Sequence, residues 1–464
     1  MIELRLSEIA SAIGGLLVGA DQLVTGSVET DSRLVSRGAL FVAKPGEFTD
    51  GHLFVKSAQD AGAVGAIVQQ QVSDSSMSQI VVEDSVHALG LLAMHVLELR
   101  RKQGEFTVIG ITGSNGKTST KNMLREILSK FDETVAPIES FNNEVGAPIS
   151  ILKISAATRY LVVELGADGL GSIEYLTKMC TPDLGVVLKV GLAHVGEFGD
   201  IDTTFKIKSE LAAGLAASAK VLLNADDSFV SQMSENTKAE VHWFGTADGL
   251  DCSASNVAVT LEGTTFDLHC GNFEAKVKLN ILGEHQVMNA LAAIGVADLL
   301  NLDLGIAVSA LEDMALAERW RMQLLPGVNG SHIINDAYNA SPDSMKAALQ
   351  TLATIGRQGH RTVAVLGEMA ELGKYSVDEH DAIGRIAVRL NIDQVVVVGE
   401  GAKIIHMGAS QEGSWDGESK FFASISDALP YLRGLLGVDD VVLVKSSNSA
   451  GLRVLGDALA EVSQ

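Results

Sequence analysis

The sequence predicts an α/β protein of several domains with mostly parallel sheets. Short runs rich in β-branched residues alternate with segments of helical period, as in "TVIGIT", "RYLVVELGA", "LGVVLKV", "RTVAVLGEM" and "DVVLVKSS". These runs lack polar alternation, which is typical of strands that helices cover on both faces. The chain has 464 residues, of which 47% are apolar, and this exceeds what one hydrophobic core usually serves.

The order of the expected elements gives three domains. The polar stretch "RRKQGE" at 100–105 separates a long helix from the next strand, so we expect the first domain to span 1–103. The second, 104–317, contains parallel strands and a segment at about 240–281 whose alternation predicts antiparallel strands in an insertion or side sheet. A new series of strands and helices begins near "SHIINDAY" and predicts a third domain, 318–464.

Composition excludes some classes of partner. Lys and Arg number 35 against 58 Asp and Glu, and the net charge of -23 disfavours nucleic acid and anionic membranes. No apolar run approaches the roughly 18 to 20 residues that span a bilayer. The cysteines, Cys180, Cys252 and Cys270, have no CxxC spacing, which favours a reduced, cytoplasmic location without a disulfide framework or zinc site. No motif bears on oligomeric state, and we expect a monomer.

A glycine-rich stretch, "GITGSNGKTST" at 110–120, follows an apolar strand and leads into a helical segment. Such a loop points backbone N–H groups at phosphates, while its lysine reaches the phosphate oxygens and the next hydroxyl binds magnesium. The strict P-loop pattern would place glycine at Ile111, whereas the glycines here are Gly110 and Gly113. We expect an ATP-binding loop formed by Gly113, Ser114, Asn115, Gly116, Lys117, Thr118 and Ser119.

This loop resembles that of the Mur ligase family, and the resemblance extends over nearly the whole chain. The stretches "FNNEVGAP" (141–148), "VVELGAD" (162–168), "INDAYNASPDSMKAAL" (334–349) and "LGEMAELG" (366–373) are most similar to one branch. That branch adds D-alanyl-D-alanine to UDP-N-acetylmuramoyl-tripeptide during peptidoglycan precursor synthesis.

The resemblance implies an ATP-dependent amide ligase. A substrate carboxylate would attack the γ-phosphate, and an amine would then attack the acyl phosphate, which gives ADP, phosphate and UDP-N-acetylmuramoyl-pentapeptide. It also implies an N-terminal UDP-sugar-binding domain, a central ATP-binding P-loop domain, and a C-terminal Rossmann-like domain that holds the amino substrate and closes on ATP.

The same resemblance implies a metal centre. Lys117 would hold the phosphates, and Thr118 with Glu164 would bind the magnesium that accompanies ATP. His194 would bind a second magnesium, and Lys208 would be carbamylated, since a carbamate supplies the oxygens that a hard cation prefers. Lys206, two residues earlier, is the rival for this role.

Further contacts are implied for the nucleotide and the two substrates. The remaining ATP contacts would be His285, Asn289, Arg321 and Asp336. The UDP-sugar peptide would meet Ser32, Arg33, Lys44, Gly46, Asn142, Asn143 and Pro148, and the dipeptide would meet Asn339, Ser341 and Lys445. Residues that depart from the usual family pattern, and leave their contacts open, are Lys189, Gln286, Ser446 and Asn448.

Three functions remain open at this point. The first is the D-alanyl-D-alanine-adding ligase. The second is another Mur ligase or a folylpolyglutamate synthetase, which the "NDAYNASP" and "LGEMAELG" stretches disfavour. The third is a nucleotide-dependent regulatory ATPase that forms no amide. The identity of the third peptide residue, lysine or a diaminopimelate, also stays open.

Overall fold

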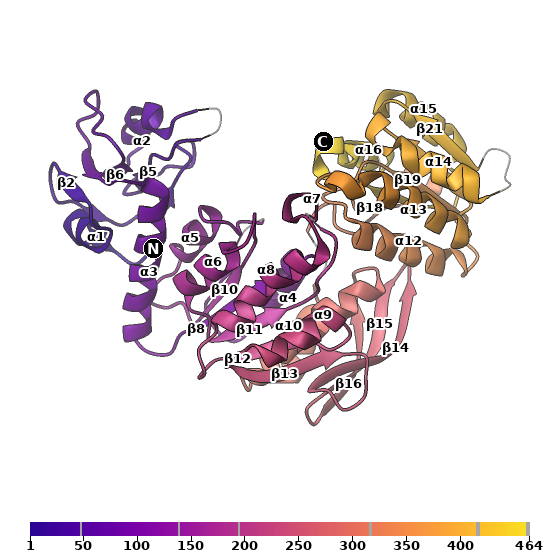
Figure 1. Cartoon of the computed structure of the whole chain (residues 1–464), viewed down its shortest axis with the longest axis horizontal. Helices are drawn as coiled ribbons and strands as arrows, with labels where there is room; N and C mark the ends of the chain where they lie inside the picture. The colour runs from indigo at the N-terminus through magenta and orange to yellow at the C-terminus, as the bar shows by residue number, and fades with distance from the viewer. Residues whose placement is uncertain (47–48, 138–139, 194, 315–317, 414–417, 461–464) are drawn as a thin grey trace.

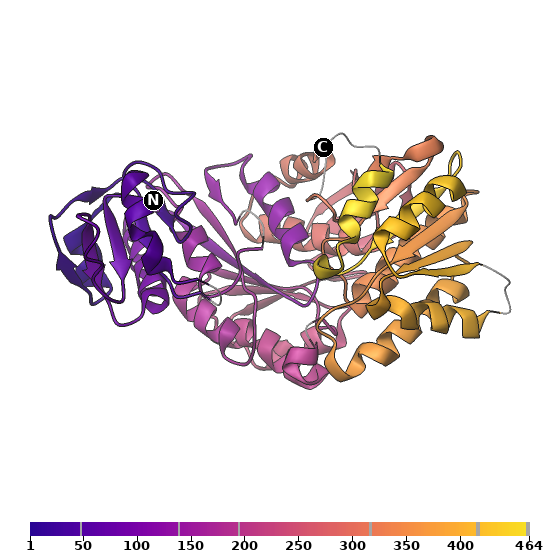
Figure 2. The ribbon, with the colours of Figure 1, turned by 90° about the horizontal axis from the view of Figure 1, so that it is seen from above.

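A computed structural model describes residues 1–464 except 47–48, 138–139, 194, 315–317, 414–417 and 461–464. Three portions of the chain follow one another along the long axis, each with a large sheet (Figure 1). Figure 2 shows the same order from above, with the indigo N-terminal portion at one end and the orange to yellow C-terminal portion at the other. The α/β class with mostly parallel sheets is thereby confirmed. The second expected boundary, 317/318, adjoins residues outside the described part of the chain.

The N-terminal portion is a five-stranded sheet of order β2-β7-β6-β5-β4, in which β2 alone is antiparallel to its neighbour, with a small β1-β3 pair beside it. Its strands are β1 (Leu4–Arg5), β2 (Leu16–Val18), β3 (Leu23–Val24), β4 (Val28–Glu29), β5 (Leu40–Val42), β6 (Gly65–Val68) and β7 (Ser78–Val81). Its helices are α1 (Leu6–Ala12), η1 (Gly51–Phe54), α2 (Val55–Asp60) and α3 (Ser85–Lys102).

The long helix α3 connects this portion to the next. It begins after Asp84, whose carboxylate accepts the N–H groups of Val86 and His87 at 2.8 and 3.0 Å, and such a cap stabilises a helix start. Its buried face belongs to one hydrophobic cluster with residues of the N-terminal sheet and of the central portion.

The central portion is a nine-stranded sheet of order β16-β15-β14-β13-β12-β11-β8-β10-β9. Its strands are β8 (Thr107–Thr112), β9 (Thr134–Val135), β10 (Tyr160–Glu164), β11 (Leu184–Val187), β12 (Lys220–Asn224), β13 (Glu240–Gly245), β14 (Cys252–Thr260), β15 (Gly263–Cys270) and β16 (Phe273–Leu279). Its helices are α4 (Lys117–Leu128), α5 (Gly146–Ile151), α6 (Ser172–Cys180), α7 (Val195–Phe198), α8 (Ile201–Gly214), α9 (Ser228–Gln232), η2 (Met233–Glu235), α10 (Glu284–Leu299) and α11 (Leu304–Glu312).

Both faces of the sheet are buried at β8, β10, β11 and β12, which explains the missing polar alternation in these parallel strands. In β8, Val108 belongs to the cluster that contains α6 and α8, whereas Ile109 and Ile111 belong to the cluster that contains α4 and α10. Successive side chains of a strand point to opposite faces, so a strand covered on both sides must be apolar throughout.

The segment at 240–281 differs in part from expectation. β14, β15 and β16 are antiparallel, as expected, but they extend the central sheet instead of forming a separate side sheet. β13 runs parallel to β12, and β14 pairs with β13 in the parallel sense through a short register. The sequence pattern showed the alternation but not the edge to which these strands attach.

The expectation of no disulfide is wrong for two of the three cysteines. Cys252 and Cys270 lie directly opposite each other on β14 and β15 and are joined by a disulfide, while Cys180 is free and buried. The sequence spacing gave no sign of this pairing, because it depends on the register of two antiparallel strands.

The C-terminal portion is a six-stranded sheet of order β17-β18-β22-β19-β20-β21, parallel except for β17. Its strands are β17 (Gln323–Pro326), β18 (His332–Asn335), β19 (Thr362–Leu366), β20 (Gln394–Val398), β21 (Ser419–Phe422) and β22 (Val441–Lys445). Its helices are η3 (Val328–Gly330), α12 (Pro342–Gly356), η4 (Gly373–Tyr375), α13 (Ser376–Arg389), η5 (Glu400–Ala402), α14 (Lys403–Glu412), α15 (Ile425–Leu435), η6 (Asn448–Ala450) and α16 (Leu452–Leu459).

The central and C-terminal portions share apolar contacts. Val195, Val259 and Leu282 of the central portion are buried in the same cluster as α12 and α13 of the C-terminal portion, and Figure 1 shows α12 facing β14 and β15. This packing places the P-loop opposite the start of α12. In the described part of the chain, no helix is long and apolar enough to cross a membrane.

Candidate active site

The glycine-rich loop lies between β8 and α4. Gly116 ends the loop with φ 89°, a conformation that favours glycine, and a Cβ atom there would lie 2.4 Å from Oδ1 of Asn289. Lys117 begins α4, and its ammonium donates to the carbonyl oxygen of Gly113 at 2.7 Å. Burial lowers the pKa of Lys117, while the Glu164 carboxylate opposes that shift. The loop therefore presents a helix N-terminus and a half-buried cation, which suits a phosphate group.

A buried carboxylate stands beside the loop. Glu164 ends β10, opposite Ile111 of β8, and is 1% exposed. Its oxygens lie 3.4 and 3.5 Å from the hydroxyl of Thr118, and Oε1 accepts from the Asn142 amide at 3.0 Å. A carboxylate and a hydroxyl are oxygen ligands that fit magnesium, which takes few protein ligands and completes its shell with water and phosphate.

The two candidate lysines of α8 differ in environment. Lys208 is 2% exposed, and burial, followed by the charge of Lys117, lowers its pKa to about 7. Lys206 is exposed. Only a neutral amine reacts with carbon dioxide, so the lowered pKa of Lys208 suits a carbamylated lysine. His194, expected on the second magnesium, lies outside the described residues.

A cavity of about 290 Å³ joins the central and C-terminal portions at the loop. Residues that were expected in the site and line this cavity are Ser114, Asn115, Gly116, Lys117, Thr118, Ser119, Asn142, Glu164, His285, Asn289, Arg321, Asp336, Asn339 and Lys445. Residues that line it but were not assigned a role are Ser140, Gln286, Met322, Tyr338 and Ser344. Segments far apart in the sequence thus surround one space of a size suited to a small molecule.

The C-terminal wall of the cavity carries positively and negatively charged side chains. Arg321 donates to the Thr118 hydroxyl at 3.3 Å and lies over the ring of Tyr338, 4.3 Å from its centroid. Asp336 and Lys445 form a buried ion pair, and Lys445 also donates to the carbonyl of Asn339 at 3.0 Å. Lys445 is paired with Asp336, and the Arg321 guanidinium forms an ion pair with Glu318 at 3.2 Å besides its contact with the loop's hydroxyl.

A second, more apolar cavity of about 260 Å³ adjoins the loop beside α10. Its lining combines His285 and Asn289, which were expected, with residues that were not, namely Leu188, Asn224, Asp226, Asp227, Phe244 and Met288, and it also includes Lys189. Asn224 ends β12, so a polar residue at the carboxyl end of an apolar strand was the available sequence signal.

His285 is uncharged near neutral pH and has a ring nitrogen available for a hydrogen bond in this cavity. Burial lowers its pKa to about 4, and its Nδ1 is buried without a hydrogen-bond partner among the described residues. Asn289 is instead engaged inside the protein, since its amide donates to Gln286 at 2.9 Å and accepts from Thr120 at 3.3 Å. The cavity suits a flat heteroaromatic ring such as a nucleobase.

Four of the residues expected to meet the UDP-sugar do not line the cavity that joins the central and C-terminal portions. Ser32, Arg33, Lys44 and Gly46 lie around β4 and β5 of the N-terminal portion and do not line it. The Arg33 side chain is 87% exposed and paired with Asp31. Their role stays a prediction.

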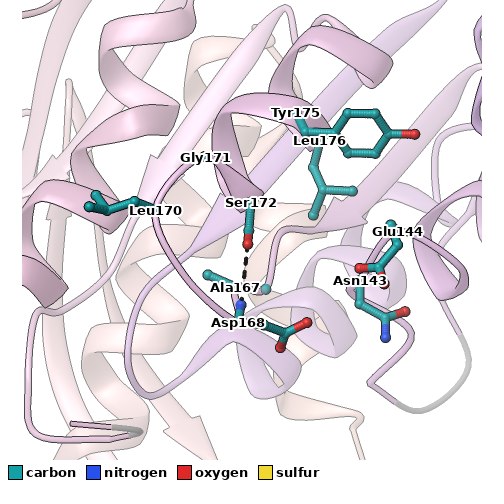
Figure 3. A pocket seen from close by; sticks show the side chains of 10 residues that line it. Asn143, Glu144, Ala167, Asp168, Leu170, Gly171, Ser172, Tyr175 and Leu176 are labelled. Atoms are coloured by element: carbon teal, nitrogen blue, oxygen red, sulfur yellow. Dashed lines mark hydrogen bonds between the residues drawn. The ribbon is translucent and has the colours of Figure 1, made fainter. Parts of the chain in front are cut away.

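Asn143 lines a third cavity, of about 360 Å³ (Figure 3). The other labelled side chains there include Glu144, Asp168 and Tyr175. Pro148 is buried within α5. Asn142 and Asn143, neighbours in the sequence, therefore serve different spaces.

The stretches at 334–349 and 366–373 both contact the loop after β22, the first through the Ser447 hydroxyl, which donates to the carbonyl of Ala340 at 3.4 Å. Ser447 donates its N–H to Glu368 at 2.9 Å and accepts from the N–H of Ala370 at 2.9 Å. Ser446 is buried and Asn448 is exposed. Ser341 begins α12 and donates to Oδ1 of Asn115 at 3.1 Å, so it contacts the P-loop directly.

Comparison with known proteins gives the family. The chain matches three family models: "Mur ligase family, catalytic domain" over residues 25–96, "Mur ligase middle domain" over 111–297, and "Mur ligase, glutamate ligase domain" over 320–448. It is 40% identical to the UDP-N-acetylmuramoyl-tripeptide--D-alanyl-D-alanine ligase of Mycobacterium tuberculosis strain H37Rv, over 99% of this chain and 98% of that one. Its identity to the Escherichia coli K12 enzyme of the same name is 33%, over 99% of both chains.

Solved structures agree with the sequence relatives. A crystal structure of MurF from Acinetobacter baumannii superposes with a TM-score of 0.89 at 31% identity, over 99% of both chains. MurF ligase from Thermotoga maritima in complex with ADP gives 0.81 at 26% identity, over 94% of this chain and 98% of that one. The chain therefore belongs to the Mur ligase family, as the resemblance in its sequence indicated.

Proposed function

We propose that this protein is an ATP-dependent amide ligase that adds D-alanyl-D-alanine to UDP-N-acetylmuramoyl-tripeptide. The products would be UDP-N-acetylmuramoyl-pentapeptide, ADP and phosphate, in peptidoglycan precursor synthesis. Full-length similarity to ligases of that name supports the substrates. The observation that carries the proposal is the cavity that the P-loop and the C-terminal portion share, because one nucleotide would contact both.

The nucleotide is assigned to the two cavities at the loop. Its base would lie against His285 in the apolar cavity, and Asn289 would shape that site through its contact with the loop. Its phosphates would lie on the loop N–H groups, Lys117 and Arg321. Asp336, held by Lys445, is assigned to the ribose, whose hydroxyl groups can donate to a carboxylate.

Magnesium is assigned to Thr118 and Glu164, and a second ion to Lys208 and His194. When bound, it neutralises charge on the phosphates. The neutral amine of Lys208 would first react with carbon dioxide, forming a nitrogen–carbon bond and releasing one proton. Counted from the ammonium form, two protons leave as the cation becomes an anion. Its pKa of about 7 supports this step, since about half of such amines are neutral near that pH.

The reaction needs a dry site. A carboxylate of the UDP-sugar peptide would attack the γ-phosphate, and the dipeptide amine would then displace phosphate from the acyl phosphate. Water would hydrolyse that intermediate, so the closely packed contact between the central and C-terminal portions protects it. Asn339, on the C-terminal wall, and Ser341, at the start of α12, are assigned to the dipeptide, and Asn142 and Asn143 to the sugar peptide.

We also propose the division into domains 1–103, 104–317 and 318–464, each built on its own large sheet. We propose that the protein acts as a monomer. We also propose a cytoplasmic location, since ATP and nucleotide-linked precursors are available there. The cysteines do not support this location, because two of the three are joined.

The test is a phosphate-release assay with purified protein and a panel of UDP-muramoyl peptides and amines. Phosphate and ADP should form only when both the tripeptide and D-alanyl-D-alanine are present. Hydrolysis of ATP alone at the same rate would identify a regulatory ATPase, and AMP with pyrophosphate would exclude the acyl-phosphate route. Turnover only with another amino substrate would identify a different ligase of the family.

A further inference from the structure

The loop at 189–192 is tied to the P-loop by three hydrogen bonds. The N–H of Ser114 donates to the carbonyl of Lys189 at 2.7 Å. The Ser114 hydroxyl accepts from the N–H of Gly191 at 2.9 Å and lies 3.2 Å from the Gly191 carbonyl oxygen. Any group that fixes the 189–192 loop therefore also fixes the start of the phosphate-binding turn.

Asp343 of the C-terminal portion contacts this loop directly. Its Oδ2 accepts the N–H of Leu192 at 3.1 Å, and its Oδ1 lies 3.4 Å from the ammonium of Lys189. Asp343 belongs to the first turn of α12, where the helix dipole stabilises a negative charge. A carboxylate at a helix start thus bonds across the boundary between the two portions.

The approach is so close that it depends on a glycine. A Cβ atom on Gly191 would lie 2.3 Å from Oδ2 of Asp343, much less than two such atoms tolerate. The 189–192 loop and the start of α12 are therefore fitted to each other, and their contact is a specific one.

A second contact also connects the start of α12 to the central portion. Ser341, at the start of α12, donates to Oδ1 of Asn115 in the P-loop at 3.1 Å, and the Asn115 amide nitrogen is buried without a hydrogen-bond partner in the part of the chain that the structure describes. The same turn of α12 thus meets the P-loop at Asn115 and through the 189–192 loop. Since Asn115 lines both nucleotide cavities, its orientation bears on ATP binding.

We propose that Asp343 is a positioning residue that holds the P-loop and the C-terminal portion in the arrangement required by a shared nucleotide. This inference rests on the proposed function. Lys189 is 47% exposed and Asp343 25%, so their ion pair contributes little by itself, and the bond to the Leu192 N–H carries most of the effect. The pair also gives a physical reason for Lys189, which stands where the family often has Asn.

The test compares Asp343→Ala and Asp343→Asn in the full chain. Asn can still accept the Leu192 N–H, whereas Ala cannot. Asp343→Ala should lower kcat about tenfold and raise KM for ATP, with KM for the UDP-tripeptide within about twofold, because positioning is lost at the phosphates. Asp343→Asn should recover most of this loss. The matched control is Asp427→Asn, which changes an acid in the first turn of α15.

Gly191→Ala supplies an independent variant. It should impair the wild-type protein and do less harm when combined with Asp343→Ala, because the clashing carboxylate is then absent. Lys189→Met should have a small effect that disappears in the Asp343→Asn background. If Asp343→Ala does not fold, Gly191→Ala by itself and the comparison of Lys189→Met in the wild-type and Asp343→Asn backgrounds decide whether Asp343 has the proposed role.

Several results would overturn the proposal. They are wild-type kcat and KM for ATP in Asp343→Ala, no relief by Asp343→Asn, or additive effects in both double variants. Binding of a non-hydrolysable ATP analogue, measured by calorimetry, separates this inference from the proposed function. A wild-type protein that forms no amide contradicts the function, while equal analogue affinity in wild type and Asp343→Ala contradicts the role of Asp343.

Discussion

The guanidinium of Arg321 donates to the hydroxyl of Thr118 at 3.3 Å, although 203 positions separate the two residues in the sequence. Thr118 follows the P-loop lysine, and Arg321 precedes the first strand of the C-terminal portion. A phosphate on the loop would therefore meet a cation from each side, and this relationship gives the first prediction.

Arg321→Ala should lower kcat/KM for ATP by about ten- to a hundredfold, because a charge-assisted contact to phosphate is removed. Arg321→Lys should retain part of the activity. The control is Arg319→Ala, since Arg319 is 60% exposed and pairs with Asp457 away from the cavity. Equal kinetics of Arg321→Ala and wild type would exclude a phosphate contact.

Thr118→Ala and Glu164→Ala should each lower kcat by about a hundredfold or more, because each removes an oxygen ligand assigned to magnesium. Thr118→Ser keeps the hydroxyl and is the matched control. Magnesium titrations should show a higher metal requirement in Glu164→Ala. A wild-type magnesium dependence in that variant would remove Glu164 from the metal site.

Lys208→Ala should be inactive and should recover partly with added formate or acetate, whose oxygens replace those of the carbamate. Lys206→Ala is the control and should keep wild-type activity, since Lys206 is exposed. Depletion of carbon dioxide should lower wild-type activity reversibly. If Lys206→Ala is the inactive and rescuable variant, the assignment moves by two residues, and full activity of both variants ends the carbamate proposal.

His285 should make folding less favourable at acid pH. Burial lowers its pKa in the folded protein to about 4, whereas the unfolded chain binds the proton near pH 6.5. Between these values the unfolded state holds more protons, so stability falls as pH decreases from about 6.5 to 4 and is unaffected above.

His285→Gln should therefore gain about 2 kcal/mol relative to wild type between about pH 7.5 and pH 5, measured by urea unfolding. His87→Gln, at an exposed position of α3, controls for the loss of a histidine. A constant difference between wild type and His285→Gln over this range would show that the folded protein protonates His285 normally.

The sequence by itself determined the class of fold and the phosphate-binding turn. Strands such as β8 and β10 were predictable because their residues are mostly apolar and lack polar alternation, and that pattern depends on burial of both faces. The glycine-rich loop from Gly113 to Ser119 was predictable because its glycines and its lysine lie within one short stretch between a strand and a helix. Local patterns of this kind do not require knowledge of distant contacts.

The tertiary structure decided which side chains meet. Lys206 and Lys208 look alike in the sequence, but two residues on a helix point in nearly opposite directions, and packing buries only Lys208. Register across β14 and β15 paired Cys252 with Cys270. The contact of Asp343 with Leu192 depends on how the central and C-terminal portions pack against each other. The two residues are 151 positions apart, and no local sequence pattern predicts a hydrogen bond over that separation.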